Sequence, residues 1–212
     1  MTTLGRVGQL WVFPVKSMTG TSVESAVVDD GGLAGDRSWA VVDDTGRTVT
    51  AADEPRLREV GTRLLDGELR LDVPGAQPGL GVAAATEALS SWLGRPLHLA
   101  HREGAGFVDV APVHVVSRAS MADAEHAEQC DACDISAPRA NLVLDLEPGG
   151  PGEQSWVGST VRIGEVQLTV VRRPDHCLGA YAEVAVAGTV RVGDPVTGPL
   201  RETRARPGSL AR

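Results

Sequence analysis

The chain contains three cysteines, and Cys177 is the one whose sequence surroundings favour chemistry. An alternating apolar stretch, 166–170, leads into the basic, proline-containing run 172–176 (RRPDH), which ends at this thiol. Neighbouring cations favour the thiolate form of a cysteine, and a thiolate is a nucleophile or a ligand for a soft metal. The alternative is an inert cysteine buried at the end of a strand.

The other two cysteines, Cys130 and Cys133, form a C-x-x-C pair. Such a pair can be a redox dithiol or half of a metal site. Three cysteines cannot complete a four-cysteine zinc or iron–sulfur site, although His126 could join the pair at a zinc ion. Acidic neighbours at Glu128 and Asp131 disfavour the thiolate form and reduce reactivity. An incidental loop dithiol is therefore the competing interpretation.

Cations and hydroxyl groups stand at the ends of expected elements. Lys16 follows one predicted strand and Arg37 precedes another, so both are expected at sheet ends, where loops converge. Arginine provides a planar fork and lysine a point charge for a phosphate. Ser117 and Ser120, at a predicted helix start, would add hydroxyls and free backbone N–H groups. The alternatives are a solvated Lys16, an Arg37 paired with Asp36, and a Ser117 that only caps the helix.

Composition narrows the classes of partner. The formal net charge of −8 argues against a nucleic-acid surface and disfavours anionic membranes. The first residues lack the apolar segment of a signal peptide, and no stretch reaches the roughly 20 apolar residues that span a bilayer. An odd number of cysteines does not form a disulfide framework, so we expect a cytoplasmic protein.

The pattern of turns predicts a mainly β protein with a few short helices. The 25 glycines and the 3% aromatic content suit short strands packed through β-branched residues. One helix is expected over 86–93, ended by Gly94, and a second from a cap at Ser117 or Ser120 to about residue 129. The tail 201–212 is expected to be disordered. Strands are predicted over 7–13, 22–28, 38–42, 47–50, 69–73, 141–146, 158–171 (as two strands) and 189–192.

Several separated stretches together resemble one family. The first four are FPVKS (13–17), GDRSW (35–39), PRANLV (138–143) and the loop that ends at Cys177, and EQSWVG (153–158) and TVRVGDPV (189–196) accompany them. In this order they resemble a MOSC-domain protein with the family's N-terminal β-barrel. Proteins of that kind include the mitochondrial amidoxime-reducing component, the bacterial proteins that resemble it, and the C-terminal domain of molybdenum cofactor sulfurase.

The resemblance implies an N-terminal β-barrel domain (1–100) packed on a MOSC β-barrel domain (101–200), which together hold a molybdopterin cofactor. It implies that Cys177 is the catalytic thiolate and the protein ligand of molybdenum. Lys16 and Arg37 match basic positions that contact the pterin and its phosphate, and Arg139 and Asn141 match the family's Arg-Pro-Asn motif. The candidate cofactor-binding set is therefore Lys16, Ser17, Arg37, Ser117, Ser120, Arg139 and Asn141.

Three features depart from the family pattern. The residues before the thiol are Asp175 and His176, where relatives often carry a serine and an arginine. The segment 178–187 leads almost directly into the final strand, whereas relatives have a longer insertion, so the substrate side of the pocket is reduced or built differently. Ala140 replaces the proline of the Arg-Pro-Asn motif, which removes no functional group.

Hypotheses of different classes follow from the resemblance. The first is a molybdenum-dependent oxidoreductase that reduces small N-hydroxylated or N-oxide substrates, with electrons from a separate redox protein because the chain carries no flavin, haem or iron–sulfur signature. The second is a sulfur carrier with a persulfide on Cys177, received from a pyridoxal-phosphate-dependent cysteine desulfurase, for metal–sulfur cluster or molybdenum cofactor sulfuration. The third is a binding module that no longer holds molybdenum.

Overall fold

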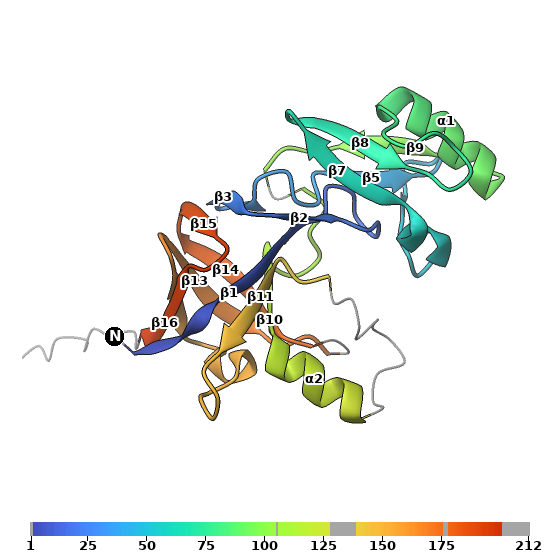
Figure 1. Ribbon diagram of the computed structural model, residues 1–212. Helices are drawn as coiled ribbons and strands as arrows, with labels where there is room; N and C mark the ends of the chain where they lie inside the picture. Colours follow the sequence, from blue (N-terminus) through green and yellow to red (C-terminus); the bar gives the residue numbers. More distant parts are fainter. Residues whose placement is uncertain (1, 105, 128–138, 176–177, 201–212) are drawn as a thin grey trace, which may run out of the picture.

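The computed structural model describes residues 2–104, 106–127, 139–175 and 178–200 (Figure 1). In this part of the chain the fold is mainly β, as predicted. The helical elements are α1 (Val82–Leu93), α2 (Arg118–Ala127) and two short 3₁₀ turns, η1 (Pro55–Glu59) and η2 (Glu153–Trp156). None of the helices described is long and apolar enough to cross a membrane.

Seven strands form a closed barrel. Hydrogen bonding runs in the order β11-β10-β14-β13-β12-β16-β1, and β1 closes the barrel by pairing with β11. A Cβ at Gly5 would lie 2.1 Å from the Asp145 carbonyl oxygen, so glycine is required where β1 passes β11. The seven strands are β1 (Thr3–Val12), β10 (Val113–Ser117), β11 (Leu142–Leu146), β12 (Thr160–Ile163), β13 (Val166–Arg172), β14 (Ala180–Val186) and β16 (Pro195–Leu200).

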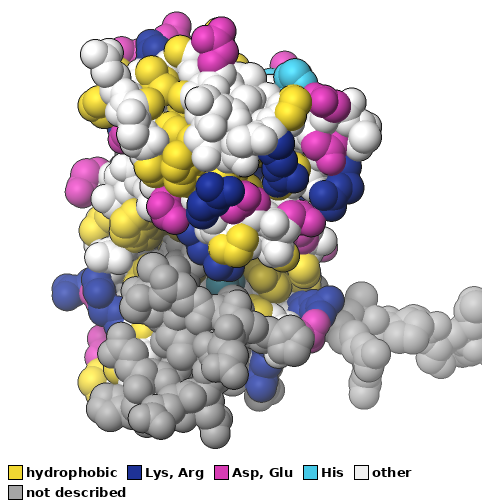
Figure 2. Space-filling view, turned by 90° about the vertical axis from the view of Figure 1, so that its right-hand side faces the viewer, with side chains coloured by type: hydrophobic (Ala, Val, Ile, Leu, Met, Phe, Trp, Pro, Cys, Tyr) yellow, Lys and Arg dark blue, Asp and Glu magenta, His cyan; other side chains and the backbone are white. Residues whose placement is uncertain are grey.

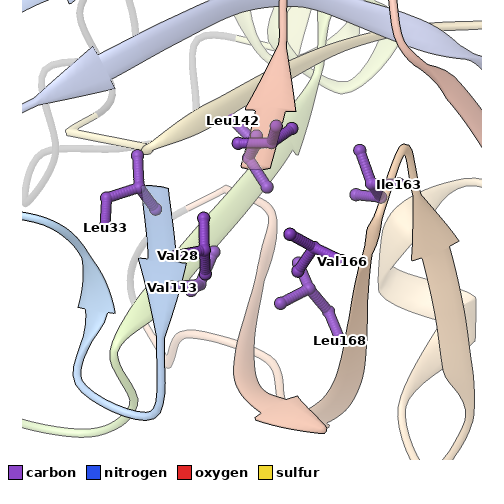
Figure 3. Close-up of a pocket in the computed structure, with 8 residues that line it drawn as sticks. Val28, Leu33, Val113, Leu142, Ile163, Val166 and Leu168 are labelled. Carbon is purple, nitrogen blue, oxygen red and sulfur yellow. The ribbon is translucent and has the colours of Figure 1, made fainter. Parts of the chain in front are cut away.

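The barrel interior is a packed apolar core (Figure 3). The cavity left between its side chains has a volume of about 10 Å³. This is about the least space that a single water needs, so the cavity between these side chains is too small for a larger ligand. The cavity is lined by Val28, Leu33, Val113, Leu142, Ile163, Val166, Leu168 and Val190.

A second layer of strands, with its own apolar core, lies beside the barrel and carries α1 (Figure 1). It combines a three-stranded sheet, β6-β5-β9, with the hairpin β7–β8. A further small sheet, β15-β3-β4, joins early and late parts of the chain, and β2 extends the barrel from β1. The strands are β2 (Thr21–Val23), β3 (Ser25–Asp29), β4 (Gly32–Leu33), β5 (Trp39–Val42), β6 (Thr48–Val49), β7 (Gly61–Leu65), β8 (Glu68–Asp72), β9 (His98–His101) and β15 (Gly188–Arg191).

The helix ends agree with the sequence more closely than the strands do. Gly94 ends α1 in the left-handed conformation, with φ 71°, although the helix begins four residues before the predicted start. The Ser120 backbone N–H donates to the Ser117 Oγ at 3.1 Å, which confirms Ser117 as a helix cap. Both signals are local, so neighbouring residues suffice to specify them.

Several strand predictions were wrong or incomplete. The expected strand 22–28 is two strands, because β2 pairs with β1 whereas β3 pairs with β15. The segment after the candidate thiol, expected to be little more than a connection, contains barrel strand β14. The strand β1 completes a barrel whose other strands all lie after residue 112, so the barrel includes residues from both sides of the expected domain boundary near residue 100. That boundary stays a prediction. The predicted tail, 201–212, lies outside the described residues.

Candidate functional site

Three of the predicted site residues meet although they are distant in the sequence. The Arg37 Nη2 group donates to the Arg139 carbonyl oxygen at 3.1 Å, and its Nη1 group is 3.3 Å from the Asn141 Oδ1 atom. Phe13 lies under both guanidinium groups, with ring centroid distances of 5.5 Å to Arg37 and 4.6 Å to Arg139. We refer to Phe13, Asp36, Arg37, Arg139 and Asn141 as the arginine cluster.

Arg37 is held rigidly within the arginine cluster. Its side chain forms an ion pair with Asp36, whose other oxygen accepts the Phe13 backbone N–H at 2.8 Å. Its backbone has a left-handed φ of 49°, and its carbonyl accepts the Phe107 N–H at 2.8 Å. The expected alternative, that Arg37 pairs with its neighbouring carboxylate, is therefore correct, but Asp36 is buried and the same guanidinium also contacts Arg139 and Asn141.

Arg139 carries the least compensated charge in the cluster. Burial, together with the charge of Arg37, lowers the pKa of Arg139 to about 9. Among the described residues, no carboxylate forms an ion pair with the Arg139 guanidinium, and Asp36 is already engaged by Arg37. The face of Phe13 offers only partial compensation for a buried cation. A bound anion would supply the charge that the cluster lacks.

Asn141 connects the cluster to the barrel. It is fully buried, and its Oδ1 atom also accepts the His114 backbone N–H at 3.1 Å. Its Nδ2 group lies 3.3 Å from the Trp11 carbonyl oxygen. Since the side chain is bonded on both sides to protein groups, it orients Arg37 rather than presenting a free amide to a ligand.

His114 and Tyr181 extend the site, and sequence reasoning missed both. The His114 Nε2 group donates to the Leu178 carbonyl oxygen at 2.7 Å, and its ring lies 4.8 Å from the Tyr181 ring. Burial lowers the pKa of His114, which favours the neutral form of the ring. Two signals were available: a histidine in an apolar strand, and the single tyrosine of the chain four residues after Cys177.

Lys16 contacts a different partner. Its Nζ group forms an ion pair with Asp109, and its side chain is only 15% exposed, so the expectation of a solvated lysine is wrong. The Lys16 backbone N–H donates to the Trp39 carbonyl oxygen at 2.8 Å, and the next residue, Ser17, has a left-handed φ of 67°. Figure 2 shows basic and acidic side chains interspersed across the middle of one face.

Ser117 and Ser120 bond to each other at the start of α2. Besides accepting the Ser120 N–H, the Ser117 hydroxyl lies 3.0 Å from the Ser120 hydroxyl. Ser117 is also only 1% exposed, which is consistent with its capping role. A contact between either hydroxyl and a ligand stays a prediction.

The predicted thiol and dithiol lie outside the described residues. Cys130, Cys133, His176 and Cys177 fall in the segments 128–138 and 176–177, so their roles stay predictions. Within the described ranges, no three His, Cys, Asp or Glu side chains gather as a metal site. Two of the described residues that flank these segments, Arg139 and Leu178, contact the site defined above.

Comparison with known proteins gives the N-terminal region a family match. Residues 4–95 match the family model of the MOSC N-terminal beta barrel domain. Mitochondrial amidoxime reducing component 2 of Rattus norvegicus is 40% identical over 79 residues, which are 35% of this chain and 23% of that protein. Mitochondrial amidoxime-reducing component 1 of Homo sapiens is 45% identical over 58 residues, which are 26% and 17% of the two chains.

These alignments cover less than a quarter of the curated relatives' length. Among solved structures, the YUAD protein from Bacillus subtilis aligns over 91% of this chain and 93% of its own, with 14% sequence identity and a TM-score of 0.46.

Proposed function

Residues 4–95 belong to the MOSC N-terminal β-barrel domain family, and from this premise we propose that the chain binds a molybdopterin cofactor at the arginine cluster. One observation carries the proposal. Arg37 and Arg139, which are 102 residues apart, lie together and largely buried, with Asp36 as the one carboxylate paired with them in the described part of the chain. An excess of positive charge that is largely removed from water is costly unless an anion completes it.

The side chains of the cluster fit a phosphate-bearing pterin. Guanidinium groups present paired N–H donors that match phosphate oxygens. Both guanidinium groups pack over the ring of Phe13. Asn141 and Asp36 would act as positioning residues, because each bonds to Arg37 and to a backbone N–H group. The cluster would therefore be organised before the ligand arrives.

Cys177 is proposed as the protein ligand of molybdenum, since a thiolate suits a soft metal already held by the pterin sulfurs. His114 supports this role from β10. Its Nε2 group donates to the carbonyl oxygen of Leu178, the residue that follows Cys177, at 2.7 Å. Its backbone N–H donates to the Asn141 side chain in the arginine cluster. His114 would then position both the Cys177 loop and the arginine cluster.

We propose that the substrate is a small N-hydroxylated or N-oxide compound, in line with the names of the amidoxime-reducing relatives. When bound, the cofactor would supply the oxygen-accepting metal, and two electrons and two protons would convert the N-hydroxyl oxygen to water. A separate redox protein would deliver the electrons. Burial raises the pKa of Tyr181, so its phenol would keep its proton and offer a hydrogen-bond donor beside the site.

The test is the content of pterin and molybdenum in protein purified from a host that makes the cofactor. We expect near-stoichiometric amounts of both in the wild type. Arg139→Gln should retain roughly tenfold less pterin, the loss typical of a charged hydrogen bond. Cys177→Ser should keep the pterin but disturb the metal. Arg70→Gln is the matched control, because Arg70 pairs with the exposed Glu68 on hairpin β7–β8.

Wild-type protein that contains neither pterin nor molybdenum would overturn the proposal. A mass increase of one sulfur atom on Cys177 in that protein would instead support the sulfur-carrier function.

A further inference from the structure

The ion pair between Lys16 and Asp109 joins a fixed cation to an exposed anion. Lys16 has a side chain only 15% exposed, and its backbone N–H is bonded to the Trp39 carbonyl oxygen. Asp109 is 74% exposed and lies on the connection between β9 and β10. The lysine is therefore held in place by the fold, whereas the carboxylate reaches it from the surface.

The segment that carries Asp109 is anchored on both sides of it. Phe107 is buried, and its backbone N–H donates to the Arg37 carbonyl oxygen at 2.8 Å. Ala111 is also buried, whereas Val110 is 45% exposed. The carboxylate can thus turn away from Lys16 by side-chain rotation without releasing either anchor.

Asp109 also lies close along the chain to a contact with the arginine cluster. It follows Phe107, whose backbone N–H donates to the Arg37 carbonyl oxygen, by two residues, and the Arg37 backbone N–H donates in turn to the Phe13 carbonyl oxygen at 2.8 Å. An anion bound between Lys16 and the cluster would therefore meet Asp109 directly. It would not displace Asp36, because Asp36 is buried and also accepts the Phe13 N–H at 2.8 Å.

We propose that Asp109 is a competing contact that occupies the place of the ligand's phosphate on Lys16 until a phosphate replaces it, and so lowers the affinity of the site for the phosphate. This inference rests on the proposed function, since it takes the ligand to be a phosphate-bearing pterin. A doubly charged phosphate interacts about twice as strongly with Lys16 as a carboxylate does at equal distance. A pterin without the phosphate cannot compete in this way. Asp109 thus lowers the affinity for the phosphate-bearing form and leaves that for the dephosphorylated form unchanged.

Equilibrium binding of two probes tests the proposal. The probes are an oxidised, fluorescent pterin that carries a phosphate and the same pterin after phosphatase treatment. We expect Asp109→Asn to bind the phosphate form about fivefold more tightly, which corresponds to about 1 kcal/mol, the upper value for an exposed ion pair. Binding of the dephosphorylated form should be unchanged. Lys16→Met should weaken binding of the phosphate form and abolish the effect of Asp109→Asn.

Asp175→Asn is the matched control. Asp175 is 68% exposed and pairs with Arg172, so the variant removes the same charge from another exposed ion pair. We expect its affinity for the phosphate form to stay within about twofold of the wild type. Thermal unfolding of all variants verifies that they are folded.

The outcomes separate this inference from the function on which it rests. Wild-type binding of the phosphate form without a gain in Asp109→Asn overturns the inference alone. An equal gain for both probes, or the same gain in Asp175→Asn, shows a general charge effect and also overturns it. Failure of every variant to bind either probe overturns the proposed function and this inference together.

Discussion

The two ion pairs of the site, Arg37–Asp36 and Lys16–Asp109, combine the same charges in opposite settings. In the first pair Asp36 is buried and also bonds to a backbone N–H group, and the side chain of Arg37 is 17% exposed. In the second pair Lys16 is largely buried, but Asp109 is 74% exposed. Burial and additional bonds, rather than the charges themselves, decide whether a pair is a fixed part of the fold or a replaceable contact.

The largest expected effect comes from breaking the buried pair. Asp36→Asn removes the buried negative charge beside the largely buried Arg37 and Arg139, which should lower the free energy of unfolding by about 3–5 kcal/mol. Urea unfolding at pH 7 measures the change. Asp109→Asn is the comparison and should change the free energy of unfolding by less than about 1 kcal/mol. Similar losses in the two variants would contradict the distinction between the pairs.

Asn141→Leu tests whether the hydrogen bonds of Asn141 stabilise the fold in addition to the Arg37–Asp36 ion pair. The substitution leaves the His114 N–H and the Trp11 carbonyl without their side-chain partner, and it removes one contact of Arg37. We expect a loss of about 2 kcal/mol in the free energy of unfolding. Ser155→Ala is a control on an exposed hydrogen bond. A loss no larger than that of the control would mean that Asn141 does not support Arg37.

The pH dependence of stability provides a third test. Burial lowers the pKa of His114 below 6.5, so the unfolded chain binds a proton more readily than the folded protein does. This contribution to stability is present above pH 6.5 and is lost as the pH falls toward the folded-state pKa. Urea midpoints between pH 7.5 and 5 should therefore fall less in His114→Gln than in the wild type. His101→Gln, at an exposed position, should follow the wild type.

The smallest effect is expected for the exposed pair. A double-mutant cycle with Lys16→Met and Asp109→Asn should give a coupling energy of at most about 1 kcal/mol. The coupling should fall further at about 1 M salt, where the screening length is about 3 Å. A coupling energy that does not fall at high salt would mean that Asp109 is a fixed part of the fold, and it would contradict the proposed replacement of Asp109 by a ligand.

Only part of this site could be predicted from the chain. Arg37, Arg139 and Asn141 were predicted through the resemblance to MOSC-domain proteins, and the structure brings them together. Asp109, His114 and Tyr181 were not predicted, because nothing in their local sequence indicates a contact with Lys16 or Leu178. These contacts join residues more than 60 positions apart, and only the closed barrel with its neighbouring layer brings them within reach.

The sequence by itself determined the features that depend on neighbouring residues. The mainly β class, the end of α1 at Gly94 and the cap of α2 at Ser117 follow from backbone preferences and local hydrogen bonds. Tertiary structure alone decided that β1 closes the barrel with β11 and that Lys16 pairs with Asp109. It also decided that Arg139 is buried without a carboxylate partner among the described residues. Burial and long-range pairing depend on the whole fold, because they are set by which surfaces exclude water together.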